Sequence, residues 1–410
     1  MTDTTPKYKY PLVADTITAE DNKAKAEWLM TNPRLTMGPL VKEYEDKCVR
    51  WFKPKKYAIA CSSGSTANEL MACALIESGR LKNKKVIVPS AAWVTSTTPF
   101  IKLGFEPIMC EADRSNFGLD PYRLEQLLRE HNPSTVMLVQ VLGVPAHMDQ
   151  IMRLKAQYGF ILLEDACAAM GSSYRGQKVG TFGDMASIST YFGHQFSTVE
   201  GGAVFTDDNE LREIMFSVRS HGWINGLEPE SRAKHLNRYG IKDIGTGFVF
   251  IYKTATNCRT SDDHAFYGIR QLDRMDWLVE RRSANHLQYQ KLLQNHFDFQ
   301  RFPERAKVCS IHFCALAQSE NERNFITSYL DSNGVETRPF TSGNQGLQPY
   351  WFAEHPWFKA YPKFTGAMAT KLYECGFFLP NYPSLGPIDI EIISATAIRG
   401  AIEFRKETQT

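Results

Sequence analysis

The sequence lacks a long apolar run: nowhere in its 410 residues is there a stretch near the roughly 18 residues that a membrane-spanning helix needs. Its opening residues, MTDTTPKYKYPL, lack the apolar core of a signal peptide. An excess of one charge is also missing, because 47 basic and 45 acidic residues leave a net charge of +2. This balance gives no reason to expect a nucleic acid or an anionic membrane as a partner.

The nine cysteines lack the spacing of a metal site. Cys309 and Cys314 form the only close pair in the sequence, and no second pair complements it. Unpaired thiols in a chain of this size are typical of a reducing compartment. We therefore expect no metal site and a cytoplasmic location.

What the sequence does contain is a regular alternation of strand and helix patterns. This alternation predicts an α/β fold whose sheet is mostly parallel, with helices on both faces. Strands are expected at residues 57–61, 85–89, 107–111, 135–141 and 160–164, and helices at 65–77, 95–103, 121–130 and 149–158.

The regions before and after this strand–helix alternation have other patterns. Residues 1–35 are expected to form an N-terminal arm, 36–295 a large α/β domain, and 296–410 a small α+β domain. The stretch 222–247 is polar and poorly patterned, so a long loop is expected there. It is followed by a long amphipathic helix over 261–293, broken near residue 275. Strands at 308–316 and 376–379 and helices at 319–332, 366–374 and 387–399 are expected in the small domain.

Small hydroxyl residues join the first predicted strand to its helix. Residues 62–66 read SSGST, which places amides and hydroxyls at a helix N-terminus, where the unpaired N–H groups and the helix dipole favour a phosphate. An ordinary helix cap explains the same residues equally well. The motif is not a Walker loop, because no lysine follows the glycine.

Two further residues fall at the same edge of the predicted sheet. Asp165 follows a buried strand, where α/β sheets bind ligands, and its carboxylate can hold a heteroaromatic ring nitrogen in the protonated form. Trp93 follows another strand and can stack on a planar ring. Taken singly, a capping role for the acid and simple packing for the tryptophan are the commoner explanations.

Together, a phosphate cradle, an aromatic plate and a strand-end acid describe a pocket for pyridoxal phosphate (PLP). The chain resembles the DegT/DnrJ/EryC1/StrS family of sugar aminotransferases, which are fold-type I PLP enzymes. The resemblance spans nearly the whole chain and includes residues 35–39 (LTMGP), 62–70 (SSGSTANEL), 145–149 (PAHMD), 164–165 (ED), 180–184 (GTFGD), 200–202 (EGG) and 257–259 (NCR).

The resemblance implies a set of cofactor contacts and a homodimer with shared active sites. A residue of the neighbouring subunit would complete each site. The implied contacts are Gly64, Ser65 and Ser189 to the cofactor phosphate, Trp93 stacked on the ring, Asp165 paired with the ring nitrogen, and Asn257 reaching the phosphate of the other subunit.

One position departs from the family's aminotransferases. They carry a lysine, which bonds covalently to the cofactor, five residues beyond the phosphate-binding serine, and here that residue is His194. No lysine lies between Lys178 and Lys234. Imidazole has no primary amine and cannot form that bond, but with a pKa of about 6.5 it can move a proton at neutral pH.

A branch of the family that resembles this chain has the same replacement. Its members are 3-dehydratases of nucleotide-linked 4-keto-6-deoxyhexoses, which hold the cofactor as pyridoxamine phosphate (PMP). The resemblance implies that His194 takes a proton from the C4′ carbon of the cofactor and that the C3 hydroxyl is expelled. It continues through residues 219–223 (RSHGW), 337–339 (TRP), 343–344 (GN) and 348–349 (QP).

The branch has two ways of supplying electrons. Some members carry an iron–sulfur cluster, with one cysteine at the position of Cys167 and three more in the loop that corresponds to residues 222–247. That stretch contains no cysteine here, and four thiolates are needed, so no cluster is expected. The other members regenerate PMP from L-glutamate. The resemblance implies this second style, with GDP-4-keto-6-deoxy-D-mannose as the first candidate substrate.

Substrate contacts are less well defined by the sequence. His221 and Arg338 are candidates, although a structural surface role explains either one slightly better. Ala168 stands where family aminotransferases often have a glutamine at the ring hydroxyl. Two other functions stay open: an aminotransferase that draws a lysine from elsewhere, and a non-catalytic PLP-binding regulator that has lost its lysine.

Overall fold

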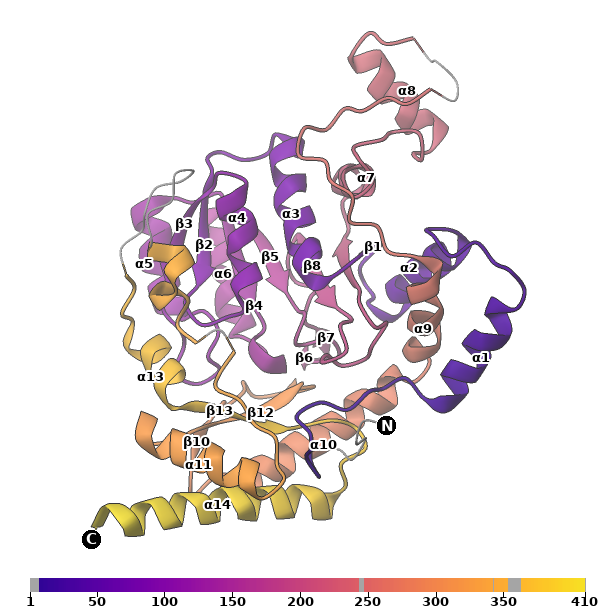
Figure 1. Ribbon diagram of the computed structural model, residues 1–410. Coiled ribbons are helices and arrows are strands. Elements are labelled where there is room, and N and C mark those ends of the chain that lie inside the picture. The colour runs from indigo at the N-terminus through magenta and orange to yellow at the C-terminus, as the bar shows by residue number, and fades with distance from the viewer. Residues whose placement is uncertain (1–6, 243–246, 342, 353–362, 410) are drawn as a thin grey trace.

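A computed structural model of the chain describes residues 7–242, 247–341, 343–352 and 363–409 (Figure 1). Its centre is a seven-stranded sheet in the order β1-β9-β8-β5-β4-β2-β3. Only β9 runs antiparallel to its neighbours. The predicted α/β class with a mostly parallel sheet is confirmed. The strands are β1 (Tyr57–Cys61), β2 (Lys85–Pro89), β3 (Glu106–Cys110), β4 (Thr135–Val139), β5 (Ile161–Asp165), β8 (Met185–Ser189) and β9 (Gly202–Thr206).

Successive side chains of these strands enter opposite cores, as the two-residue period of a strand requires. Leu163 packs beneath α3 (Gly64–Ser78), α4 (Thr98–Lys102) and α7 (Asn209–Val218). Its neighbour Leu162 packs against α5 (Pro121–His131) and α6 (Met148–Tyr158) on the other face. Helices therefore cover both faces, and the strand ends are left as the place for polar side chains.

A smaller antiparallel sheet lies at the carboxyl ends of the parallel strands, at the bottom of Figure 1. It consists of β10 (Asp298–Phe299), β12 (His312–Leu316) and β13 (Gly376–Pro380). One face packs on α11 (Glu320–Ser332) and α14 (Pro387–Gln409). The other face sets Cys314 and Phe378 against Ala92 and Ala168, which follow β2 and β5. The smaller sheet thus covers the edge where the predicted site residues gather.

The remaining elements connect these layers. The predicted break in the long helix is confirmed, because it divides into α9 (Asp262–Leu272) and α10 (Met275–Leu293). The others are α1 (Ala19–Leu29), α2 (Pro39–Trp51), α8 (Pro229–Arg238), α12 (Pro349–Phe352), α13 (Ala367–Cys375), the 3₁₀ turns η1 (Val94–Ser96), η2 (Val141–Gly143) and η3 (Gln345–Leu347), and the short strands β6 (Ser173–Tyr174), β7 (Gln177–Lys178) and β11 (Ala306–Lys307).

Three expectations of local structure were wrong. The helix expected at 95–103 is the turn η1 followed by the short helix α4, because Pro99 can only occupy a first turn. The strand expected at 308–316 begins only at His312. The stretch 222–247, expected to be a loop, contains the helix α8, of which Leu236 is the buried residue. Residues 243–246 of that stretch lie outside the described ranges.

The segment that carries α8 projects beyond the body of the molecule (Figure 1). Leu236 packs with Ile224, Leu227 and Val249 in a small apolar cluster of its own. The helix is short and strongly polar, with one buried residue, which explains why polarity alone indicated a loop. Within the described ranges, no helix is both long and apolar enough to span a bilayer.

Candidate active site

Asp165 ends the central strand β5 and is buried. Its Oδ2 accepts hydrogen bonds from Asn68 Nδ2 and Ser96 Oγ, both at 2.8 Å. Its Oδ1 accepts one from the main-chain N–H of Cys167 at 3.0 Å. Three donors from three segments fix the plane of the carboxylate. They satisfy it as an anion, which is the form that pairs with a protonated ring nitrogen.

Asn68 is a member of this site that the sequence reasoning missed. Its Oδ1 accepts a hydrogen bond from Ser187 Oγ at 2.6 Å, while its Nδ2 also donates to the main-chain oxygen of Thr95 at 3.2 Å. The side chain therefore ties α3 to β8 and to the turn after β2. The available signal was an asparagine, a poor helix former, inside a helix that is otherwise apolar at its buried positions.

The predicted cradle lies at the N-terminus of α3. Ser63 caps the helix and exchanges hydrogen bonds with Thr66, at 3.1 and 3.0 Å, in a capping box. Gly64 is buried against β8, so closely that an added Cβ would lie 2.6 Å from the Cβ of Ser189. Ser65 Oγ bonds Thr95 Oγ1 at 3.0 Å. The structure thus brings Gly64, Ser65 and Ser189 together at a helix N-terminus, where an anion is stabilised.

We predict that Gly64→Ala destabilises the fold and weakens PLP binding. The new methyl group would also lie 2.9 Å from Cys167 Sγ, so either α3 or β8 must shift, at a cost of about 1–3 kcal/mol. Urea unfolding and a PLP titration measure the two effects. Gly386→Ala is the matched control, because its Cβ would meet only Asp389 Oδ2, at 3.5 Å. Equal stability of the two variants would contradict the close approach.

Trp93 immediately precedes η1, and 52% of its surface is exposed. The same turn supplies Ser96 to the carboxylate of Asp165. The tryptophan is therefore held at the strand edge by a turn anchored to the acid, with ring surface available for stacking.

His194 lies in the segment between β8 and β9. Its main-chain N–H donates to Tyr191 O at 3.0 Å, and its own carbonyl accepts from Arg282 Nη2 at 3.0 Å. The ring atom Nδ1 is buried and has no hydrogen-bond partner. Burial lowers the pKa of His194 to about 4, and the positive charges of Arg282 and Arg338 act in the same direction, against the attraction of Asp165. The imidazole is therefore neutral at pH 7 and able to accept a proton.

The two lysines that flank His194 in the sequence lie elsewhere in the fold. Lys178 Nζ donates to the main-chain oxygen of Trp51 and lies 3.9 Å from the centroid of that ring. Lys234 belongs to α8, in the projecting segment. Neither lysine takes the place of the missing amine in this chain.

Asn257 and His221 lie beside the cradle. Asn257 is exposed and forms a bridge with Ser220, while the next residue, Cys258, accepts a hydrogen bond from Ser62 N at 2.9 Å. His221 has a φ of +66° and stands 5.2 Å from the ring of Trp223. No contact described for this chain joins His221 to His194, so the suggested substrate role of His221 stays a prediction.

Arg338 lies on the other side, beside β13 of the smaller sheet, where its carbonyl accepts a hydrogen bond from Phe378 N. Its guanidinium stands 5.3 Å from the ring centroid of Phe378, and it is near enough to influence the protonation of His194. Its substrate role is likewise a prediction. Residue 342, within the predicted substrate segment, lies outside the described residues.

These observations fit a PLP-type cofactor. The chain offers an anchored anionic carboxylate, an exposed indole, a closely packed helix N-terminus beside a serine, and a buried imidazole nitrogen without a partner. A seven-stranded sheet covered at its carboxyl edge by a smaller sheet, with these groups between them, defines the fold-type I, aminotransferase-like class. The chain belongs to the DegT/DnrJ/EryC1/StrS aminotransferase family, whose model matches residues 16–397.

Its relatives include dehydratases. The GDP-4-keto-6-deoxy-D-mannose 3-dehydratase of Yersinia pseudotuberculosis is 30% identical over 341 residues, which cover 82% of this chain and 85% of the relative. The Escherichia coli GDP-4-keto-6-deoxy-D-mannose 3-dehydratase, solved with bound hydrated PLP, is 27% identical with a TM-score of 0.85, covering 95% of this chain and 99% of that one. A structure of the same name with a trapped PLP-glutamate geminal diamine gives the same identity and score, covering 95% and 100%.

Proposed function

We propose that the protein is a PLP/PMP-dependent 3-dehydratase of a nucleotide-linked 4-keto-6-deoxyhexose, acting in the cytoplasm. GDP-4-keto-6-deoxy-D-mannose is the first candidate substrate and L-glutamate the amino donor. One observation carries the proposal: a neutral, half-buried imidazole, His194, stands where an aminotransferase needs a lysine. The dehydratases at 27–30% identity, one of them solved with a glutamate adduct, support the same reaction.

Several residues of the site are expected to hold the cofactor. When bound, the cofactor supplies an amine for the substrate's keto group and a ring that accepts electrons. Asp165 keeps the ring nitrogen protonated, and Trp93 covers one face. The helix N-terminus at Gly64 and the hydroxyls of Ser65 and Ser189 hold the phosphate.

His194 provides the acid–base chemistry. The neutral imidazole takes up a proton at a ring nitrogen, and the resulting imidazolium can return that proton to the C3 hydroxyl as it leaves. The lowered pKa of His194 favours the return of that proton. Since imidazole cannot displace a product amine covalently, the nitrogen must leave by hydrolysis and be replaced from glutamate.

A spectroscopic experiment tests this proposal. Purified protein is incubated with PLP and L-glutamate, and the absorption spectrum is followed for conversion of PLP to PMP. Borohydride should leave no covalent adduct of cofactor and protein. A stable adduct on a lysine would favour the aminotransferase, and failure to convert PLP would favour the non-catalytic regulator. A panel of GDP-, CDP- and dTDP-linked 4-keto-6-deoxyhexoses then identifies the substrate.

We also propose a homodimer in which Asn257 of one subunit completes the site of the other. Asn257 is exposed at the edge of the cradle. Nearby, Trp223 stacks on Phe248 at 4.6 Å, and Phe248 and Phe250 are 59% and 57% exposed. Exposed aromatic side chains gathered in this way are typical of protein–protein interfaces.

Mixing two inactive variants tests the shared site. In a heterodimer of His194→Asn and Asn257→Ala subunits, one of the two sites would carry both native residues. Random re-pairing of equal amounts should therefore restore about a quarter of the wild-type activity, because half of the dimers are mixed and each has one intact site. Activity that stays at the mean of the two variants would place both residues in one subunit's site.

A further inference from the structure

Arg282, on α10, is a buried cation with an unusual set of partners. Its side chain is 2% exposed, and its guanidinium donates to main-chain oxygens of His194, Ser310, Ile311 and Asn381. The distance to His194 O is 3.0 Å. Among the described residues, no acid forms an ion pair with Arg282. Burial lowers the pKa of Arg282 to about 10, so it remains charged at neutral pH.

Burying such a charge is costly, and here carbonyl dipoles alone offset the cost. The four carbonyls come from three places: the His194 segment, the chain entering β12, and the end of β13. A guanidinium can bond several acceptors at once because its donors form a rigid fork. Arg282 thus joins the segment of the proposed base to the smaller sheet.

Further hydrogen bonds hold residues that accept from the Arg282 guanidinium. Asn381 Nδ2 donates to Ser310 Oγ at 2.7 Å and to Ser310 O at 3.1 Å. It also donates to the main-chain oxygen of Arg282 at 3.2 Å. His286, one helical turn beyond Arg282, bonds Ser310 Oγ at 2.8 Å. Two of the four partners of the guanidinium, Ser310 and Asn381, are therefore held by further hydrogen bonds.

The charged groups around His194 come from several elements. Asp165 on β5 favours the imidazolium, whereas Arg282 on α10 and Arg338 beside β13 disfavour it. His312 on β12 is also near and is neutral, because burial lowers its pKa well below the usual value. Of these groups, only Arg282 is hydrogen-bonded to the His194 main chain in the described structure.

We propose that Arg282 is a positioning residue: its hydrogen bond to the His194 carbonyl fixes the His194 segment against the smaller sheet. This inference rests on the proposed role of His194 as base. This link between the His194 segment and the smaller sheet matters because one imidazole must reach both a cofactor held by the large sheet and a sugar covered by the small one. Without it, His194 could still lie in the pocket, but its place would not be fixed.

Two variants and one control separate position from charge. Arg282→Met keeps the length and removes the charge, whereas Arg282→Lys keeps the charge and removes the fork. Arg281→Met is the matched control, because Arg281 also binds main-chain oxygens, of Pro383 and Leu385, at 3.1 and 2.6 Å, but not that of His194. The pH dependence of His194 acylation by diethyl pyrocarbonate, followed by peptide mass spectrometry, gives the protonation midpoint without any need for catalysis.

We expect the midpoint of His194 to rise in Arg282→Met but to stay below the ordinary value of about 6.5, because burial, the larger cause of its depression, remains. The midpoint should stay unchanged in Arg281→Met. In Arg282→Lys the midpoint should hold while kcat falls about 10- to 100-fold, with KM little changed. An unchanged midpoint in Arg282→Met, or an equal shift or loss of kcat in the Arg281→Met control, would overturn the proposal. If Arg282→Met does not fold, full kcat in Arg282→Lys would by itself overturn the positioning role. Failure of PLP conversion in the unmodified protein would reject the proposed function separately.

Discussion

Replacing His194 with lysine is expected to convert the protein from one that cannot bond its cofactor covalently into one that does. The same change should lower dehydration by about 10²–10⁴-fold, the usual contribution of a general base. Lysine supplies the primary amine that imidazole lacks. At this half-buried site, beside Arg282 and Arg338, its pKa should fall, and a neutral amine is the reactive form.

Mass spectrometry after borohydride reduction measures this outcome. His194→Lys should gain the mass of a reduced pyridoxyl group on the peptide that contains residue 194, and the unmodified protein should not. His194→Asn is the control, because it removes the base without adding an amine, so it should lose dehydration and form no adduct. Dehydration retained in His194→Lys would show that another residue is the base.

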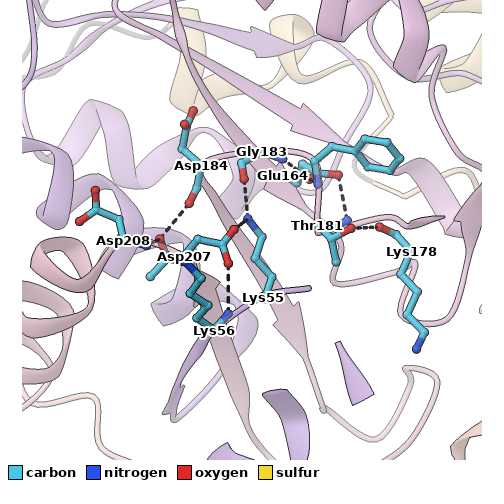
Figure 2. Close-up of polar contacts among 12 residues, drawn as sticks. Lys55, Lys56, Glu164, Lys178, Thr181, Gly183, Asp184, Asp207 and Asp208 are labelled. Carbon is cyan, nitrogen blue, oxygen red and sulfur yellow. Dashed lines mark hydrogen bonds and ion pairs between the residues drawn. The ribbon is translucent and has the colours of Figure 1, made fainter. Parts of the chain in front are cut away.

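The second large effect is expected at Glu164, which immediately precedes Asp165 and is fully buried. Its Oε1 accepts from the N–H groups of Phe182 and Gly183, at 2.7 and 2.6 Å. Its Oε2 accepts from Gly180 N at 2.8 Å and from Gln140 Nε2 at 3.0 Å. Figure 2 shows part of this arrangement, with the carboxylate facing the turn before β8. Because four donors already point at the two carboxylate oxygens, a side chain that itself carries an N–H or O–H donor does not fit at this position.

Glu164→Gln is therefore expected to destabilise the fold by about 3–5 kcal/mol. Whichever way the amide is turned, its NH₂ group faces two N–H donors, so two charge-assisted hydrogen bonds are lost and two buried donors are left unsatisfied. Urea unfolding measures the change. Glu200→Gln, at an exposed acid of the segment before β9, should change stability by less than about 0.5 kcal/mol. A loss at Glu164 below about 1 kcal/mol would mean that the turn rearranges around the amide.

The sequence predicted the parts of the fold and site that depend on local pattern. Asp165 could be placed because an apolar run ends on it, and the cradle because a strand leads through small residues into a helix. The partners of these residues could not be placed. Asn68 and Ser96 bond Asp165, and Ser187 bonds Asn68, only after distant segments of the chain have packed together. No spacing in the sequence indicates these contacts.

The partners of Arg282 were even harder to predict from the sequence. In the sequence it is one of two adjacent arginines in an amphipathic helix, a pattern that usually indicates a solvated face. Only the packing of α10 between the His194 segment and the smaller sheet distinguishes the buried Arg282 from its neighbour Arg281. The helix α8 was missed for a different reason, because its stability comes from a small apolar cluster formed by residues on both sides of it.

The N-terminal segment has a consequence for the order of assembly. Tyr10 pairs with Val335, and Leu12 N donates to Glu336 Oε2, a contact across 324 positions of the chain. At roughly 5–20 residues per second, a ribosome needs about 15–65 seconds to make that stretch. Tyr10 and Leu12 must therefore wait, without their partners, until Val335 and Glu336 have been made. Because the smaller sheet covers the carboxyl edge, the reaction centre is closed only after β13 has been made.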